Sequence, residues 1–312
     1  MTKRAIIIDA DPGQDDAFAL LLALACGDQL EVIGVTAVSG NLEVVHTAAN
    51  ALKVLKLAKR EDIPVFAGAS SPLIAPPVYA SAIHGPAIMQ GWDLPASSVS
   101  PQDAFAPDWI VDTVCTMPPK SVTLCALGPL TNIALAIAKK PEVCSRLDQI
   151  VLMGGAQVQG GNMTPVSEFN IFADPHAAAR VFAAPVRKVV VSLDVTAKLP
   201  VSLDWIAAVA RIDKNKHLSG LLELYAALAR EGHPRPLHDP AVIAWLLEPE
   251  LFRSEEVNVE IETTPGLCYG QTVLDRNGLS KRKPNARWVT DVGASSFYEM
   301  LLKALRKVIP AH

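Results

Sequence analysis

The sequence predicts an α/β fold built on an open, mostly parallel sheet with helices on both faces. Short apolar runs alternate with longer helical stretches from residue 5 to residue 193. Most of these runs are apolar along their whole length, as strands buried on both faces of a parallel sheet are. Polar or small residues follow several runs directly, and the carboxyl ends of such strands are where ligands bind.

The first two thirds of the chain supply six predicted strands. Ala5–Ile8 is uninterrupted by polar residues, and Arg187–Leu193 is the clearest strand because it holds three consecutive valines. Helices are expected between the strands, at about Asp16–Ala25, Glu43–Lys59 and Asp108–Thr116, and after Pro129. The predicted strands are Ala5–Ile8, Glu31–Val38, Pro64–Ala67, Val122–Ala126, Ile150–Met153 and Arg187–Leu193.

From about Val201 the pattern becomes mostly helical and then antiparallel. Val257–Glu262 alternates apolar and polar residues, as an antiparallel or edge strand does, and Gln271–Leu274 and Arg287–Thr290 are its expected partners. Because no linker divides the sequence, we expect a single domain over residues 1–312 with a C-terminal helical and antiparallel elaboration. The helices predicted here are Leu203–Arg211, His217–Arg230, Pro240–Leu247 and Ser295–Val308.

Composition and charge exclude several classes of protein. Half of the 312 residues are apolar, and the net charge of −4 is spread without the basic stripe that nucleic acid requires. The five cysteines are scattered and never spaced Cys-x-x-Cys, which favours reduced thiols in the cytoplasm over disulfides or a zinc site. The longest apolar run, Ala17–Cys26, is about half of the roughly 20 residues that span a bilayer. We therefore expect a soluble cytoplasmic protein that binds neither nucleic acid nor membrane.

Four aspartates lie within eight residues, directly after the first predicted strand. In the segment AIIIDADPGQDD they are Asp9, Asp11, Asp15 and Asp16. Carboxylates this close raise one another's pKa, and no Lys or Arg lies between Arg4 and Lys53 to offset their charge. A helix N-cap needs only one of them. Hard cations such as Ca²⁺ take oxygen ligands from clustered aspartates, so the segment predicts a metal site.

Two further groups of polar residues are candidates for a site. Asn162, Glu168 and Asn170 follow the strand that ends at Met153, and their amides and carboxylate suit a ligand with several hydroxyl groups; a Gly-rich turn with a loop carboxylate is the alternative. His238 and Asp239 open a helix, where an Asp N-cap before Pro is the structural alternative to a metal ligand beside a proton donor. Asp194, which ends a buried strand, is expected to cap a loop.

Taken together, these residues resemble the inosine-uridine-preferring nucleoside hydrolases over nearly the full chain. The DADPGQDDA segment is similar to the family's N-terminal Asp-x-Asp-Pro-Gly-x-Asp-Asp motif. Further segments agree in order: Val38–Asn41, Leu127–Asn132, Met153–Gly155, Gly161–Asn162 with Glu168–Asn170, and His238–Asp239. The resemblance implies a Rossmann-like nucleoside hydrolase architecture and Ca²⁺-dependent hydrolysis of the N-glycosidic bond of ribonucleosides, in purine or pyrimidine salvage. It also implies a homodimer or homotetramer.

The resemblance assigns roles to individual residues. Ca²⁺ would be bound by Asp11, Asp16, Asp239 and the main-chain carbonyl of Leu127, a position where the family often has Thr. Asp11 would take a proton from the calcium-bound water, and His238 would lie near the leaving base. Asp15 and Asn41 would hold the ribose 2′-hydroxyl. The full set of residues that would bind the substrate is Asp15, Asn41, His84, Met153, Asn162, Glu168 and Asn170.

Two departures from the family pattern concern the nucleobase. The family's His-Gly-Glu loop reads His84-Gly85-Pro86 here, and the segment before His238 is short and basic, with Tyr225 as its nearby aromatic residue. The Asp275–Gly278 turn is more like members that act on both purines and pyrimidines, so we expect a broad base range. Two alternatives stay open: a haloacid-dehalogenase-type phosphohydrolase, which also opens with strand-Asp-x-Asp, and a non-catalytic Ca²⁺-dependent nucleoside-binding protein.

Overall fold

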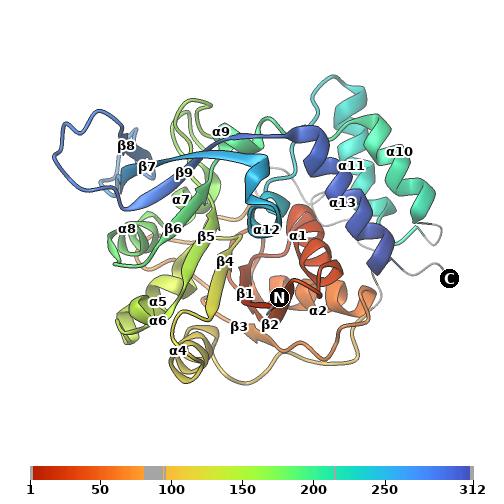
Figure 1. Cartoon of the computed structure of the whole chain (residues 1–312), viewed down its shortest axis with the longest axis horizontal. Helices are drawn as coiled ribbons and strands as arrows, with labels where there is room; N and C mark the ends of the chain where they lie inside the picture. The colour runs from red at the N-terminus through yellow and green to blue at the C-terminus, as the bar shows by residue number, and fades with distance from the viewer. Residues whose placement is uncertain (1–2, 81–93, 95, 214–215, 310–312) are drawn as a thin grey trace.

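A nine-strand mixed sheet runs through the computed structural model, which describes residues 3–80, 94, 96–213 and 216–309 (Figure 1). Its strand order is β3-β2-β1-β4-β5-β6-β9-β7-β8. Neighbours are parallel from β3 to β9, whereas β7 is antiparallel to both β9 and β8. The strands are β1 Arg4–Ala10, β2 Leu30–Ala37, β3 Val65–Ala67, β4 Val122–Ala126, β5 Gln149–Met153, β6 Lys188–Val191, β7 Phe252–Ile261, β8 Thr272–Asp275 and β9 Ala286–Val292.

Helices cover both faces of this sheet. One face packs against α1 (Gln14–Ala25), α2 (Val44–Leu57), α10 (Leu203–Ile212), α11 (Ser219–Arg230), α12 (Pro240–Leu247) and α13 (Ala294–Val308). The other packs against α4 (Ala106–Thr116), α5 (Thr131–Lys139), α6 (Val143–Arg146), α7 (Phe169–Ala173) and α8 (Pro175–Ala183). The short helix α9 (Leu193–Thr196) comes directly after β6, and the single turn η2 (Pro249–Leu251) lies between α12 and β7.

The apolar strands fill two cores because successive side chains point to opposite faces. Ile6 and Ile8 of β1 are fully buried in the first core, and Ile7 between them is fully buried in the second. This is why residues 5–8 of β1 are all apolar and show no polar alternation. The predicted α/β fold with a mostly parallel sheet and helices on both faces is confirmed.

The C-terminal part of the chain has two pieces. Its strands extend one edge of the sheet, and its helices pack against one face. Figure 1 shows α10, α11 and α13 grouped together, while the β7–β8 ribbons and their loops project on the opposite side. The strand β9 inserts between β6 and β7, so the last strand in sequence connects the parallel and antiparallel parts. We propose that residues 1–312 form one domain, because one sheet takes strands from both ends of the chain.

Some expected boundaries differ from those in the structure. The segment predicted as a strand to Leu193 leaves the sheet at Val191, because Ser192 and Leu193 turn into α9. The strand predicted at Val257 begins at Phe252 and is an interior strand, since β9 and β8 pair with its two sides. Four short helices were not predicted, because runs of four to nine residues carry little periodic pattern: α6, α7, α8 and α9.

No helix in the described ranges is long and apolar enough to cross a bilayer. All five cysteines are free thiols; Cys26, Cys125 and Cys144 are buried, and Cys268 is exposed.

Candidate active site

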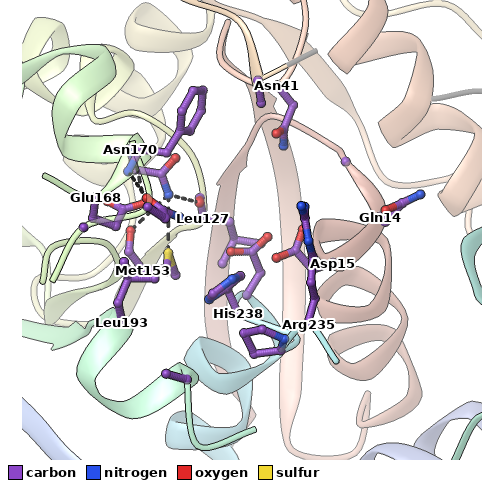
Figure 2. A pocket seen from close by; sticks show the side chains of 18 of the residues that line it. Gln14, Asp15, Asn41, Leu127, Met153, Glu168, Asn170, Leu193, Arg235 and His238 are labelled. Carbon is purple, nitrogen blue, oxygen red and sulfur yellow. Dashed lines mark hydrogen bonds between the residues drawn. The ribbon is translucent and has the colours of Figure 1, made fainter. Parts of the chain in front are cut away.

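A cavity of about 560 Å³ opens at the carboxyl ends of the parallel strands (Figure 2). Segments that follow β1, β2, β4 and β5 form part of its wall, and the chain around Arg235 and His238 forms another part. Ten of the residues singled out from the sequence line it together: Asp11, Asp15, Asn41, Leu127, Met153, Asn162, Glu168, Asn170, His238 and Asp239. Residues separated by more than 200 positions thus meet at one place, as binding at strand ends requires.

An acidic cluster lies against this cavity. Carboxyl oxygens of Asp15, Asp16 and Asp239 are all within 4.8 Å of one another. Asp16 and Asp239 are 0 % and 4 % exposed, whereas Asp15 is half-buried. Asp16 lies behind the cavity lining, at the start of α1, where its Oδ2 accepts the Gly13 N–H at 2.9 Å. The three carboxyl groups therefore share a small volume with little water to screen them.

Burial and mutual repulsion disfavour the charged forms of these groups. Burial raises the pKa of Asp16 to about 7, and the Asp15 charge adds to the effect. The pKa values of Asp11 and Asp239 are raised well above their ordinary range, again by burial first and by neighbouring aspartates second. Asp16 and Asp239 are among the closely spaced groups that repel one another in this way. A cation among them would remove this penalty.

The donor set fits a hard cation. Oδ1 of Asp16 is buried and accepts no hydrogen bond from any described residue, although a buried carboxylate oxygen normally has a partner. Its neighbours are carboxylates, which are the ligands that Ca²⁺ and Mg²⁺ prefer. The grouping differs in one respect from the ligands expected from the sequence: Asp15 belongs to the close cluster, whereas Asp11 stands outside it and couples to Asp16 by its charge.

The turn after β2 holds Asp11 in place. The Asn41 backbone N–H donates to Asp11 Oδ2 at 2.6 Å, and the Asn41 amide donates to the Asp11 carbonyl at 3.0 Å and to Asp16 at 3.4 Å. A side chain at Gly40 would collide with the Asp11 carboxylate, so a glycine is required at this close approach. Asn41 therefore links Asp11 to Asp16 and also lines the cavity.

Glu168 and Asn170 form the opposite wall (Figure 2). The buried Glu168 carboxylate accepts N–H groups from Gly155 at 3.0 Å, Asn170 at 2.8 Å and Ile171 at 3.2 Å, and it caps α7. Burial still raises its pKa, because these bonds only partly offset the loss of water. The Asn170 amide donates to the carbonyls of Leu127 at 2.7 Å and Met153 at 3.2 Å. The ends of β4 and β5 and the start of α7 are thereby locked together.

Asn162 and His238 lie toward the more open parts of the cavity. Asn162 is exposed, and its Oδ1 accepts the Phe169 N–H at 2.8 Å. His238 is half-buried, and its Nδ1 lies 2.7 Å from Thr196 Oγ1. Burial lowers the pKa of His238, with Asp15 opposing and Arg235 reinforcing the shift. Tyr225 also lines this side, and burial raises the pKa of its hydroxyl. His84 lies outside the described residues.

The chain is similar in sequence to proteins of a known enzyme family. The family model described as inosine-uridine preferring nucleoside hydrolase matches residues 6–299. The chain belongs to this family. It is 41 % identical to the pyrimidine-specific ribonucleoside hydrolase RihA of Shewanella woodyi, covering 97 % of this chain and 98 % of that one. It is also 41 % identical to an uncharacterised protein of Schizosaccharomyces pombe, over 97 % and 99 % of the two chains.

Solved structures agree with this assignment. A plant nucleoside hydrolase superposes with a TM-score of 0.90 at 30 % identity, covering 99 % of this chain and all of that one. A purine-preferring ribonucleoside hydrolase from Gardnerella vaginalis superposes with a TM-score of 0.89 at 26 % identity, over 98 % and 99 %. The protein is a hydrolase of N-glycosyl bonds, and the phosphohydrolase alternative is wrong.

In this nucleoside hydrolase the first aspartate of the opening segment, Asp9, lies apart from the other three. Asp9 is fully buried and its Oδ1 accepts Thr36 Oγ1 at 2.5 Å and the Asn132 amide at 2.8 Å. Burial raises its pKa to about 7. Asn132 also accepts the Ala69 N–H at 2.8 Å. Asp9 therefore joins β1 to β2 and to the loop after β3, beneath the cavity.

Two residues of this region were not predicted as site residues: Thr196, which bonds His238, and Arg235, which lines the cavity. Thr196 follows β6 by five residues, so the rule that sites lie at strand ends could have found it. Asp194 does hold a loop, as expected: its Oδ1 accepts the N–H groups of Gln157, Val158 and Gln159 at 2.8–3.1 Å. That loop leads into the Gly160–Asn162 part of the cavity wall.

Proposed function

We propose that this nucleoside hydrolase carries out Ca²⁺-dependent hydrolysis of ribonucleosides to ribose and free base, with purine and pyrimidine bases both accepted. The observation that carries the proposal is the meeting, in one cavity, of a buried aspartate cluster with a facing wall of Asn and Glu side chains. Charged oxygens on one side suit a cation and a sugar diol, and amides on the other suit further hydroxyl groups.

Asp11, Asp16, Asp239 and the Leu127 carbonyl are the proposed Ca²⁺ ligands, and the position of Asp15 makes it a further neighbour of the ion. Support comes from the close carboxyl oxygens and from the unpartnered Asp16 Oδ1. The Leu127 carbonyl accepts one hydrogen bond, from Asn170, and a carbonyl oxygen has a second lone pair to offer. A bound Ca²⁺ would lower the pKa of a water molecule and orient the ribose diol.

The residues of the chain supply the remaining chemistry. Asp11 is proposed to accept a proton from the attacking water, which forms a bond to the ribose carbon as the N-glycosidic bond breaks. Positive charge develops on the sugar ring in this reaction, and nearby carboxylates stabilise it. His238 is proposed to donate a proton to the departing base, a role suited to an imidazole near neutral pH.

Ribose recognition is proposed to be strict and base recognition loose. Asp15, Asn41, Asn162, Glu168 and Asn170 are the proposed partners of sugar hydroxyls. Leaving a buried polar partner unpaired costs on the order of 1–3 kcal/mol. Deoxynucleosides should therefore lose at least about tenfold in kcat/KM. On the base side the wall includes the exposed residues Pro234 and Arg235, and inclusion of pyrimidines is supported by the RihA relatives, which are named as pyrimidine-specific.

The proposal is tested by following ribose release from uridine, cytidine, inosine and adenosine, with and without a calcium chelator. Asp11→Asn and Asp16→Asn should lower turnover by at least about 10²-fold and weaken Ca²⁺ binding measured by calorimetry. Asp28→Asn, at an exposed aspartate after α1, is the control and should change neither. Full activity of metal-free enzyme, or no ribose from any nucleoside, would contradict the proposal.

We further propose a cytoplasmic homodimer or homotetramer, as expected from the reduced cysteines and from the resemblance to the family. Sedimentation at micromolar protein concentration measures the oligomeric state, and a monomer would contradict this part of the proposal.

A further inference from the structure

Thr196 and His238 form a hydrogen-bonded pair between two separate segments of the chain. Thr196 belongs to the short helix α9 after β6, and His238 precedes α12. Thr196 is fully buried, and its Oγ1 lies 2.7 Å from Nδ1 of the ring. His238 lines the cavity, and Figure 2 shows its ring between Met153 and Leu193 on one side and Asp15 and Arg235 on the other.

The contact determines which edge of the imidazole is available to a ligand. Because Nδ1 is engaged by Thr196, Nε2 is the ring nitrogen left for a ligand in the cavity. A threonine hydroxyl can accept a hydrogen bond from Nδ1–H and can also donate one to a bare Nδ1. When Nδ1 carries a proton, it keeps that proton as Nε2 gives up its own, so the same partner holds the ring in one orientation before and after.

The hydroxyl of Thr196 has an alternative use that it does not take in the structure. Threonine in a helix often bonds the carbonyl four residues earlier, which here is that of Ser192. In this structure that carbonyl accepts the Thr196 backbone N–H at 3.0 Å, whereas the Thr196 hydroxyl bonds His238. Its bond thus crosses from the β6 end of the sheet to the base side of the site.

We infer that Thr196 is a positioning residue for the reaction: it holds His238 so that Nε2 faces the leaving base. The inference rests on the proposed function and names a residue that acts through His238. When the N-glycosidic bond breaks, its electron pair passes to the base nitrogen or ring, and the Nε2 proton moves to the base. Nδ1–H stays on the ring and donates to Thr196 Oγ1, while Asp11 holds the proton taken from water.

Thr196→Val tests this role because it keeps the shape of the side chain and removes the hydroxyl. We expect kcat for uridine and inosine to fall about 10–10²-fold, since a misoriented group loses that much in rate. KM should change less than about twofold, because the sugar contacts are untouched. Hydrolysis of p-nitrophenyl riboside, whose leaving group needs no proton, should stay within about twofold. Thr196→Ser retains a hydroxyl and should restore most of the rate on nucleosides.

Thr123→Val is the matched control. Thr123 in β4 is also fully buried, and its Oγ1 has no hydrogen-bond partner among the described residues, so removal of this hydroxyl should leave both rates unchanged. The ratio of the uridine rate to the nitrophenyl rate does not depend on how much of a variant folds. The inference is overturned if Thr196→Val leaves this ratio unchanged, or if Thr196→Ser fails to restore it. If wild-type enzyme releases no ribose from any nucleoside, the proposed function fails, which is a different result.

Discussion

His238 and Asp239 are neighbours in the chain but belong to different parts of the site. Asp239 joins Asp15 and Asp16 within 4.8 Å, whereas the His238 ring bonds to the buried Thr196 behind the cavity lining. Both residues lie just before α12, where Pro240 begins the helix. A change at each position should therefore damage a different step.

His238→Ala should slow nucleosides by about 10²–10⁴-fold, which is the usual contribution of a general acid. p-Nitrophenyl riboside should be spared, because nitrophenolate leaves without a proton. Asp239→Ala should slow both substrates alike and weaken Ca²⁺ binding. Steady-state rates on the two substrate types, together with calorimetric titration of Ca²⁺, check the difference. Equal slowing of both substrates by His238→Ala would show that the ring positions the sugar, and Tyr225 would then be the next candidate for the acid.

At the scale of elements, the helix α9 supports two walls of the cavity although it has only four residues. Thr196 bonds the histidine on the base side. Asp194 accepts three backbone N–H groups from residues 157–159, and its second oxygen accepts Trp288 Nε1 at 3.3 Å. Leu193, between β6 and these residues, lines the cavity itself. The end of β6 thus links the loop that carries Asn162 to the rest of the sheet.

Asp194→Ala should release the 157–159 loop, since hydrogen bonds to a charged group contribute about 1.5–3 kcal/mol each. We expect KM for uridine to rise about fivefold or more, with a smaller change in kcat, because a looser loop must be ordered on binding. Amide hydrogen exchange at residues 157–162 should quicken. Asp204→Ala, at an exposed aspartate in α10, is the control. Unchanged exchange and unchanged KM would show that the loop does not depend on Asp194.

At the scale of the whole molecule, the buried acids of the site lower the stability of the protein, and the proposed cation would offset this loss. A ligand present at 100 times its Kd adds about 2.7 kcal/mol to the free energy of unfolding. Adding Ca²⁺ to chelated protein should therefore raise Tm by about 3–6 °C. The Asp16→Asn variant should show a much smaller rise. Calorimetric or fluorescence melting checks both, and an equal rise in the variant would place the stabilising ion elsewhere.

A second whole-molecule effect comes from Lys188, which is 2 % exposed at the start of β6. Its Nζ donates to the carbonyls of Ala184 at 2.7 Å and Val186 at 2.9 Å. Burial lowers the pKa of Lys188 to about 8 from its ordinary value of 10.5. Below pH 8 the Lys188 amine is protonated in both the folded and the unfolded chain. Burial of this charge then lowers the stability of the folded state. That cost is relieved as the pH rises from about 8 toward 10.5.

Lys188→Met should remove this pH dependence. The quantity to compare is the free energy of unfolding of the wild type minus that of the variant. This difference should increase by about 1–3 kcal/mol between pH 7.5 and pH 10, whatever its sign at pH 7.5. Urea unfolding at several pH values measures the difference. Lys303→Met, at an exposed position of α13, is the control and should show a much smaller change. A difference that is flat with pH would contradict the shifted pKa.

The sequence by itself determined the class of fold, because the continuous apolar strands and the long helices each have a local residue pattern. The alternation of these patterns along the chain then indicates an α/β fold. It also determined the acidic segment and the ordered motifs, since these depend on residue types at fixed short spacings. Some short helices, such as α7 and α9, were not predicted, because four or five residues hold no resolvable helical period.

Only the tertiary structure decided how the four aspartates divide. Asp9 points to Thr36 and Asn132, Asp11 to the Asn41 backbone, and Asp15 and Asp16 toward Asp239, although all four lie in one short segment. The pairing of Thr196 with His238 and the insertion of β9 between β6 and β7 were likewise invisible in the sequence. The physical reason is the same in each case. Local pattern depends on residues a few positions apart, whereas these contacts depend on strand order and side-chain direction, which are set only when distant segments pack together.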